Sequence, residues 1–88
     1  MNIGEAYKEI KKEFPSISIS RIRFLEKEGL IQPKRSNGGT RSFSKKDITR
    51  IKNILDLQEN QFYSLKAIKN NPKLLVNPLA NSKIVIKE

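Results

Sequence analysis

The stretch Ser16–Gly29, SISISRIRFLEKEG, predicts one short helix with both of its ends marked. Ser18 is a favourable N-cap, because its hydroxyl can accept a hydrogen bond from an amide two or three residues further on. Gly29 stands where helices commonly end in a residue with left-handed backbone conformation. We therefore expect a helix over residues 18–28, and the rest of the chain is interpreted around it.

This helix has two different faces at about 3.6 residues per turn. One face is expected to lie on a core and comprises Ile19, Ile22, Leu25 and Glu26. The other is cationic with an aromatic residue in its middle, and it comprises Ser20, Arg21, Arg23, Phe24 and Lys27. A helix that offers small polar and arginine side chains from its first turns fits the major groove of B-DNA. The alternative is an ordinary amphipathic surface helix.

The composition limits the classes of function. The chain has 88 residues, enough for one small domain, with 31% charged residues and a mean hydropathy of −0.57. No apolar run approaches the roughly 18 residues of a membrane span, and no signal-peptide core is present. The absence of cysteine and histidine excludes disulfides, thiolate zinc sites and catalysis by those residues. We therefore expect no enzyme, no cofactor and no metal.

The charge is basic and unevenly distributed. The net charge is +9 and the isoelectric point is near 10.1, which indicates a polyanionic partner: nucleic acid first, an anionic membrane surface second. Residues 30–46 contain five cations and no acid. Because this segment directly follows the helix at 18–28, we expect the two to act together. The alternative is a charged face kept for solubility.

A first helix is expected before this one. Asn2 and Glu5 have the spacing of a capping box. A helical apolar stripe follows, made of Ile3, Ala6, Ile10 and Phe14. Pro15 should end the helix, since the residue before a proline avoids the α conformation. A tight turn over residues 15–17 then makes a helix-turn-helix, in which the second helix is the reading helix.

Residues 30–43 predict a basic β-hairpin, or wing. Leu30 and Ile31 should begin its first strand, and Pro33 restricts that strand to an edge position. The second strand should return over residues 40–43. Cations on such a hairpin can reach phosphates or a minor groove. The alternative is a plain surface hairpin.

The turn of this hairpin is expected at Asn37 and Gly38. Both central positions of a type I′ turn need positive φ, and an Asn-Gly pair provides it at the lowest cost. Gly39, the next residue, adds further freedom or a bulge.

Two more helices and a tail complete the chain. Ser44 should cap a third helix that has Asp47 in its first turn and runs to about residue 59 or 60. Its expected buried stripe is Ile48, Ile51, Ile54 and Leu55. Ser64 should cap a short fourth helix that ends before Pro72. We expect one domain over residues 1–71 and an irregular tail over 72–88, whose Ile84-Val85-Ile86 could instead add a strand to a neighbour.

Four blocks of residues, in their order along the chain, resemble the DNA-binding domain of MerR-family transcription regulators. The similar blocks are Ile3-Gly4-Glu5, Ile22–Glu26 with Glu28–Ile31, Gly39–Ser44 with Asp47-Ile48, and Ser64–Ile68. They match the family's I-G-E, L-R-Y-Y-E…G-L-I, G-Y-R-x-Y…D-[LI] and S-L-K-x-I, and together they cover residues 2–71. Residues 14–26 look most like the actinobacterial FtsR-like branch, whose members are linked to the control of cell-division genes.

The resemblance implies a mainly α fold with a small β-hairpin: a winged helix-turn-helix with a helix pair as second wing. It implies groove or backbone contacts for Arg23 and Phe24, a wing contact for Arg41, and a backbone contact for Lys66. Ser20 and Arg21 fall at the positions that meet bases. The full set of expected DNA-binding residues is Ser18, Ser20, Arg21, Arg23, Phe24, Lys27, Arg35, Asn37, Thr40, Arg41 and Lys66.

This chain departs from the family pattern at three places. Phe24 stands where the family often has Tyr, so a hydroxyl contact to phosphate is lost. Thr40 replaces the usual wing Tyr. After Pro72 the long dimerising helix and effector-binding region of typical members are missing, so ligand sensing is not expected. The chain is then either a fragment or a short effector-less regulator of the BldC-like kind.

The expected function is a sequence-specific, double-stranded-DNA-binding transcription regulator of the bacterial cytoplasm, associated with the nucleoid. The reading helix 18–28 should meet the major groove, and the wing 30–43 the backbone or minor groove. The alternatives are an architectural protein of the excisionase type, a BldC-like regulator that binds direct repeats cooperatively, and a protein-interaction module. A homodimer, head-to-tail self-association on DNA and a contact to RNA polymerase stay open; no membrane partner is expected.

Overall fold

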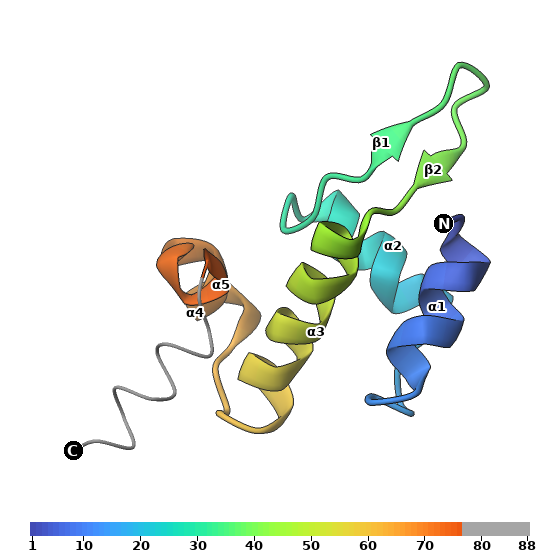
Figure 1. The fold of residues 1–88 in the computed structure, drawn as a ribbon. Helices are drawn as coiled ribbons and strands as arrows, with labels where there is room; N and C mark the ends of the chain where they lie inside the picture. Colours follow the sequence, from blue (N-terminus) through green and yellow to red (C-terminus); the bar gives the residue numbers. More distant parts are fainter. Residues whose placement is uncertain (77–88) are drawn as a thin grey trace. The chain divides into compact units, whose positions relative to one another are not determined.

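Short helices and one small hairpin follow one another in the computed structural model, which describes residues 1–76 (Figure 1). The elements are α1 (Ile3–Lys11), α2 (Ile19–Lys27), β1 (Lys34–Arg35), β2 (Arg41–Ser42), α3 (Lys45–Glu59), α4 (Leu65–Asn70) and α5 (Lys73–Val76). The predicted fold class, a mainly helical winged helix-turn-helix, is confirmed. The chain divides into two compact units, residues 1–52 and 53–88, which are described in turn.

Helix α1 begins as predicted but ends early. The Asn2 side chain accepts from the Glu5 amide at 2.8 Å, and the Glu5 carboxylate accepts from the Asn2 amide at 2.9 Å. The helix stops at Lys11 rather than at Pro15. Phe14 stays buried, and its amide still donates to the Ile10 carbonyl at 2.9 Å, but it lies outside the helix. The connection to α2 is therefore longer than the tight turn that the sequence predicted.

Helix α2 has both of its predicted ends. The Ser18 hydroxyl accepts from the Arg21 amide at 3.1 Å. At the other end Gly29 has φ of 78°, and the Leu30 amide donates to the Leu25 carbonyl at 3.0 Å. This bond is the mark of a Schellman motif, whose left-handed position costs glycine little because glycine has no Cβ. Both ends are thus fixed by residues of the stretch 16–29 and by Leu30 directly after it.

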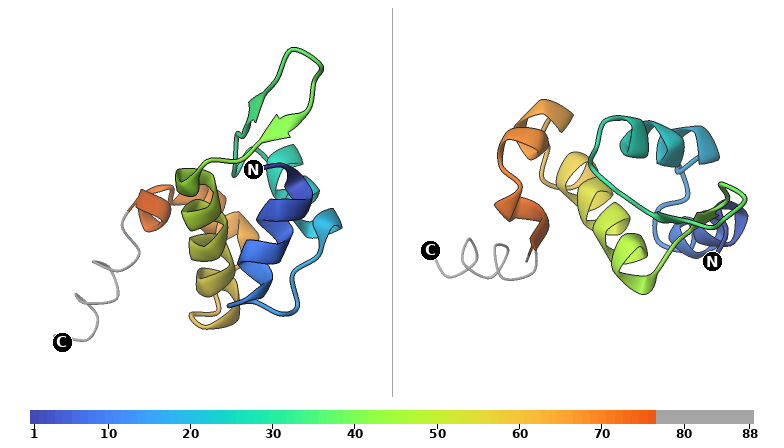
Figure 2. Two further views of the ribbon diagram at one scale, coloured as in Figure 1. Left: turned by 45° about the vertical axis from the view of Figure 1, so that its right-hand side comes forward. Right: turned by 90° about the horizontal axis from the view of Figure 1, so that it is seen from above.

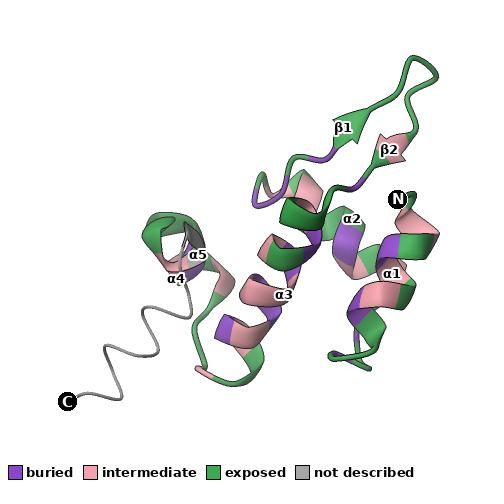
Figure 3. Cartoon of the chain, in the orientation of Figure 1, coloured by how far each residue is buried: buried purple, intermediate pink, exposed green. Residues whose placement is uncertain are grey.

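The apolar face of α2 lies in the core of the first unit (Figure 3). Ile22 and Leu25 are fully buried, whereas Ile19 is half-buried. The other buried residues of this unit come from α1, the connections, the base of the hairpin and α3; they are Ala6, Ile10, Phe14, Ile17, Leu30, Ile31, Pro33, Phe43, Ile48 and Ile51. Burying one such large side chain contributes about 1.5–3 kcal/mol. Helices α1 and α2 pack on each other as a helix-turn-helix requires.

The hairpin is shorter than predicted. Strands β1 and β2 pair antiparallel, with Lys34 opposite Ser42 and Arg35 opposite Arg41. The first strand starts after Pro33, not at Leu30, because proline has no amide hydrogen for the ladder. Leu30 and Ile31 are instead buried in the core. The loop end of the hairpin projects beyond the helices of its unit (Figure 2).

The predicted type I′ turn at Asn37 and Gly38 is wrong. Of these loop residues only Gly39 has positive φ, 81°. The Gly39 amide donates to the Ser36 carbonyl at 2.9 Å, and the Ser36 amide donates to the Thr40 carbonyl at 2.8 Å. The loop thus has three residues and ends in a left-handed glycine, the next most common hairpin geometry. It forms because a second glycine directly follows the Asn-Gly pair.

The base of the hairpin also pairs with the start of the chain. The Phe43 amide donates to the Met1 carbonyl at 2.7 Å, and the Met1 nitrogen donates to the Phe43 carbonyl at 3.0 Å. Helix α3 begins two residues later at a capping box. The Ser44 hydroxyl accepts from the Asp47 amide at 3.2 Å, and the Asp47 carboxylate accepts from the Ser44 amide at 2.8 Å. The predicted cap of the third helix is confirmed.

In the second unit, α3 ends at Glu59, as predicted, and α4 is capped by Ser64, whose hydroxyl accepts from the Ala67 amide at 3.1 Å. Ile68 of α4 is buried. The sequence predicted an irregular tail from residue 72, and within its described part residues 73–76 form α5. The apolar triplet at 84–86 lies outside the described residues.

Candidate nucleic-acid interface

The residues of α2 that the sequence assigned to DNA lie on its outer side. Ser20, Arg23, Phe24 and Lys27 are exposed and Arg21 is half-buried. Phe24 is 41% exposed, which is unusual for a phenylalanine and leaves its ring available to a partner. The predicted division of α2 into an apolar and a cationic face is therefore confirmed by the burial of its side chains.

Arg21 and Phe24 contact each other on this outer side. The guanidinium carbon of Arg21 lies 5.9 Å from the centre of the Phe24 ring, a cation–π distance. Arginine stacks favourably on an aromatic face because its planar charge is weakly hydrated. The contact restricts Arg21, whose own amide is bonded to the Ser18 hydroxyl. Ser18 is thus engaged in capping the helix.

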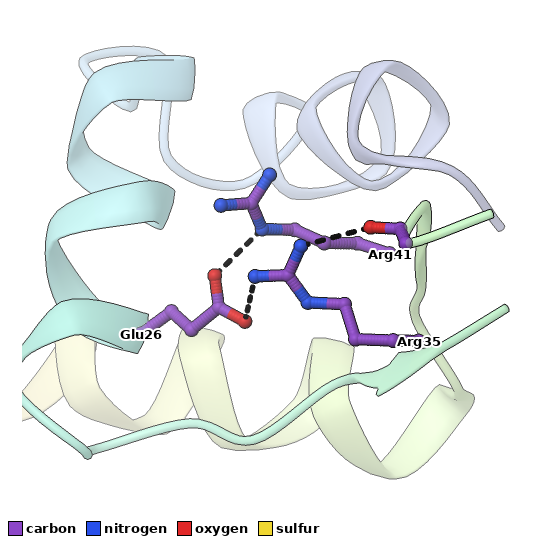
Figure 4. A network of polar contacts seen from close by, with 4 residues as sticks. Glu26, Arg35 and Arg41 are labelled. Atoms are coloured by element: carbon purple, nitrogen blue, oxygen red, sulfur yellow. Dashed lines mark hydrogen bonds and ion pairs between the residues drawn. The ribbon is translucent and has the colours of Figure 1, made fainter. Parts of the chain in front are cut away.

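A carboxylate on α2 binds both arginines of the hairpin (Figure 4). Arg41 donates from Nε to Glu26 Oε1 at 2.6 Å, and Arg35 donates from Nη2 to Glu26 Oε2 at 3.0 Å. Arg35 also donates from Nη1 to the Gly39 carbonyl at 3.0 Å. The cationic hairpin is therefore attached to the same helix that carries the cationic face.

The electrostatics of Glu26 favour its charged form. Partial burial raises the pKa of the Glu26 carboxyl, but the hydrogen bond and charge of Arg41, followed by those of Arg35, outweigh it and leave the pKa below its ordinary value. The Glu26 side chain is 19% exposed and that of Arg41 is 23% exposed. The pair is thus only partly screened by water.

The remaining predicted residues are exposed. Asn37 lies in the hairpin loop, Thr40 directly follows the loop, and Lys66 lies on α4 in the second unit. The basic segment 30–46 also contains three exposed lysines that were counted in its charge but not among the expected DNA-binding residues, namely Lys34, Lys45 and Lys46. Within the first unit, α2 and the hairpin thus bring together a dense set of cations.

Sequence reasoning missed the role of Glu26, which it placed on the core-facing side without a partner. A carboxylate on that side is costly unless it is paired, and the basic segment directly afterwards supplied the cations. This was the signal that could have revealed the contact. Arg50 was also missed; its Nε donates to the Leu30 carbonyl and joins α3 to the end of α2.

Two kinds of site are not seen in residues 1–76. This part of the chain has no group of three or more acidic, histidine or cysteine side chains that could hold a metal ion. It also has no helix whose length and apolar character would let it cross a membrane.

The class that the fold and this surface define is a winged helix-turn-helix protein with a basic outer face. Residues 1–71 match the sequence model of the family described as MerR HTH family regulatory protein. The chain therefore belongs to the MerR family, as the resemblance had implied.

The curated relatives carry the names of transcription regulators, not of enzymes. The chain is 41% identical over 69 residues to uncharacterized HTH-type transcriptional regulators of Mycobacterium bovis and Mycobacterium tuberculosis, covering 78% of this chain and 28% of each relative. It is 33% identical over 64 residues to the HTH-type transcriptional regulator TnrA of Bacillus subtilis, covering 73% of this chain and 58% of that protein. The matches thus span less than two thirds of each relative. No solved structure matches the chain.

Proposed function

We propose that this chain binds double-stranded DNA in a sequence-specific manner and regulates transcription. Helix α2 enters the major groove, and the hairpin contacts the backbone or the adjacent minor groove. One observation supports this most: the Glu26 ion pairs attach the basic hairpin to the helix that carries the exposed cationic face. A single polyanion that spans both elements would neutralise cations from each.

On α2 the proposed base contacts come from Ser20 and Arg21, near the N-terminal end. Arginine can donate two hydrogen bonds to the O6 and N7 atoms of guanine, and its contact with Phe24 already restricts its direction. Arg23 and Lys27 contact phosphates. Phe24 has no hydroxyl, so it packs its ring against a sugar.

The supporting contacts come from outside the reading helix. In the hairpin, Asn37 and Thr40 at the loop and Arg41 on β2 contact the backbone. In α4, Lys66 contacts it as part of the second wing. The DNA-binding domain spans residues 1–71, which is also the range of the family match.

Membership of the FtsR-like branch, a cytoplasmic location on the nucleoid and binding as a homodimer complete the proposal. The names of the relatives support a regulator. A contact with RNA polymerase would follow if the chain acts at promoters.

The test is binding of a mixed-sequence duplex over a series of salt concentrations. Arg41→Ala should weaken binding and lower the slope of log K against log salt by about one unit, because one phosphate contact is lost. Lys12→Ala removes the same charge from the end of α1, where Lys12 pairs with Glu9, and should leave the slope unchanged. Equal slopes for Arg41→Ala and the unaltered chain would remove Arg41 from the interface. No binding at low salt would contradict the proposed function.

A further inference from the structure

The two arginines of the hairpin bind the same carboxylate in different ways. They face each other across the ladder, Arg35 on β1 and Arg41 on β2. Both reach Glu26, which comes from the reading helix and not from the hairpin. Sequence alone assigned both arginines to DNA. The atoms they use divide them into two roles.

Arg35 uses both of its terminal nitrogens within the protein. Nη2 donates to Glu26 and Nη1 donates to the Gly39 carbonyl, each at 3.0 Å. One guanidinium therefore joins the loop end of the hairpin to α2. These two bonds hold the guanidinium between the hairpin loop and α2, and each terminal nitrogen keeps a second N–H.

Arg41 uses only its inner nitrogen for this carboxylate. Nε donates to Glu26 Oε1 at 2.6 Å, and Figure 4 draws no bond from the terminal nitrogens to that carboxylate. A guanidinium carries five N–H donors in a fixed plane, so a bond at Nε fixes the direction of the Nη groups. Those groups have the geometry that phosphate oxygens accept.

We propose that Glu26 is a positioning residue for DNA binding: it presents the terminal nitrogens of Arg41 to a phosphate and, through Arg35, holds the hairpin against the reading helix. Arg35 then acts inside the protein and not on DNA. This inference rests on the proposed function, which it deepens by naming which wing arginine meets the backbone.

The opposite role for Glu26 would be competition with the phosphate. A carboxylate close to a phosphate repels it, and an arginine bound to the carboxylate would have to be released first. Positioning is favoured because Arg41 need not leave Glu26 to bind a phosphate. Ordering a long arginine side chain also costs conformational entropy, and a side chain that is already ordered avoids that cost on binding. Neutralising the carboxylate should weaken DNA binding if Glu26 positions Arg41, and should tighten it if Glu26 competes with the phosphate.

Glu26→Gln is the deciding variant, and Glu9→Gln is its matched control. Both raise the net charge by one, but Glu9 lies on α1 and pairs only with the exposed Lys12 in the described structure. On a mixed-sequence duplex Glu26→Gln should bind about three- to tenfold more weakly than the unaltered chain, because Arg41 and the hairpin lose their order. Glu9→Gln should bind equally or slightly more tightly. Binding of Glu26→Gln as tight as that of Glu9→Gln would overturn the proposal.

The two arginines provide a second comparison on the same duplex. Arg35→Gln should weaken binding and keep the salt slope, whereas Arg41→Ala should lower the slope by about one unit. In the Arg41→Ala background, Glu26→Gln should cause a smaller loss than it does alone, because one of its partners is gone. A fall in slope for Arg35→Gln equal to that for Arg41→Ala would contradict the division of roles.

A measurement without DNA separates this proposal from the proposed function. The Arg41 Nε–H should exchange slowly with solvent in the unaltered chain and in Glu9→Gln, and faster in Glu26→Gln, as followed by nitrogen-15 NMR. Unchanged exchange in Glu26→Gln would overturn the positioning role while leaving DNA binding intact. A chain with a protected Nε–H that binds no duplex would instead overturn the proposed function, and the role of Glu26 on DNA with it.

Discussion

Helix α2 and the hairpin lie side by side in the chain but are stabilised differently. The ends of α2 are held by bonds among its own neighbours, from Ser18 at one end to Gly29 and Leu30 at the other. The strands of the hairpin have two residues each, too few for independent stability. The hairpin relies on buried residues at its base and on a carboxylate from α2. Helix α2 is thus locally encoded, and the hairpin depends on it.

This difference has a consequence for binding. An interface assembled from a stable helix and a marginal hairpin would be poorly ordered if the two moved separately. The Glu26 ion pairs connect α2 to both arginines of the hairpin. Changes in α2 should therefore disturb the hairpin, while changes in the hairpin should leave α2 folded.

The largest effect is expected where α2 meets the core. Ile22→Asp should unfold the first unit, because Ile22 is fully buried and a carboxylate there would have no partner. We expect a loss of about 3–5 kcal/mol, which is a large fraction of the stability of a small domain. Circular dichroism and chemical denaturation would measure it. Arg23→Asp, one position further on the exposed face, should stay folded; a stable Ile22→Asp variant would show that the helix phase is wrong.

An intermediate effect is expected at the glycines that end each element. Gly29→Ala in the helix cap and Gly39→Ala in the hairpin loop should each lower the free energy of unfolding by about 1–2 kcal/mol, because both positions have positive φ. An added Cβ would meet no atom within 4 Å at either position, so the cost comes from the backbone conformation and not from a clash. Gly38→Ala is the control and should be neutral within about 0.5 kcal/mol, because its φ is not positive. Urea denaturation of the three variants would measure the losses. A type I′ turn would instead make Gly38→Ala costly.

The smallest effect is expected at the link between the two elements. Glu26→Gln should lower the free energy of unfolding by about 1 kcal/mol near neutral pH, a value between those of exposed and buried ion pairs. The pKa of Glu26 lies below its ordinary value of 4.5, so this stabilisation is complete above that pH and is lost as the pH falls through the lowered pKa. Denaturation of both proteins over a pH series would follow it. A difference in the free energy of unfolding between the two proteins that persists after Glu26 is protonated would have to come from packing.

The difference between a helix stabilised by its own neighbours and a hairpin that depends on that helix also explains what the sequence could predict. Helix α2, its caps and its two faces are confirmed, because Ser18, Gly29 and the spacing of Ile22 and Leu25 act over short distances. The start of β1 and the type I′ turn were wrong, whereas the freedom or bulge expected at Gly39 agrees with its positive φ. The strand begins after Pro33, and Leu30 and Ile31 before it are buried in the core. Gly39 has positive φ and ends a three-residue loop.

The cationic face of α2 could be predicted from the sequence, but the ion pairs of Glu26 with the hairpin could not. Periodicity and charge placed Arg21, Arg23 and Lys27 on the outer side of α2, where they lie. They could not show that Arg35 and Arg41 converge on Glu26, since that depends on how the hairpin folds back on the helix. The contribution of each predicted residue to DNA binding stays a prediction that the variants above can test.

The most direct test of DNA reading is selection of bound duplexes from a random-sequence pool by the full chain, followed by sequencing. We expect an enriched motif, and inverted half-sites within it would indicate a symmetric dimer. Repeating the selection with Arg21→Ala should relax one base preference, which corresponds to about 1–3 kcal/mol of discrimination. A pool that is retained without enrichment would contradict sequence reading by α2, and a pool that is not retained even at low salt would contradict DNA binding itself.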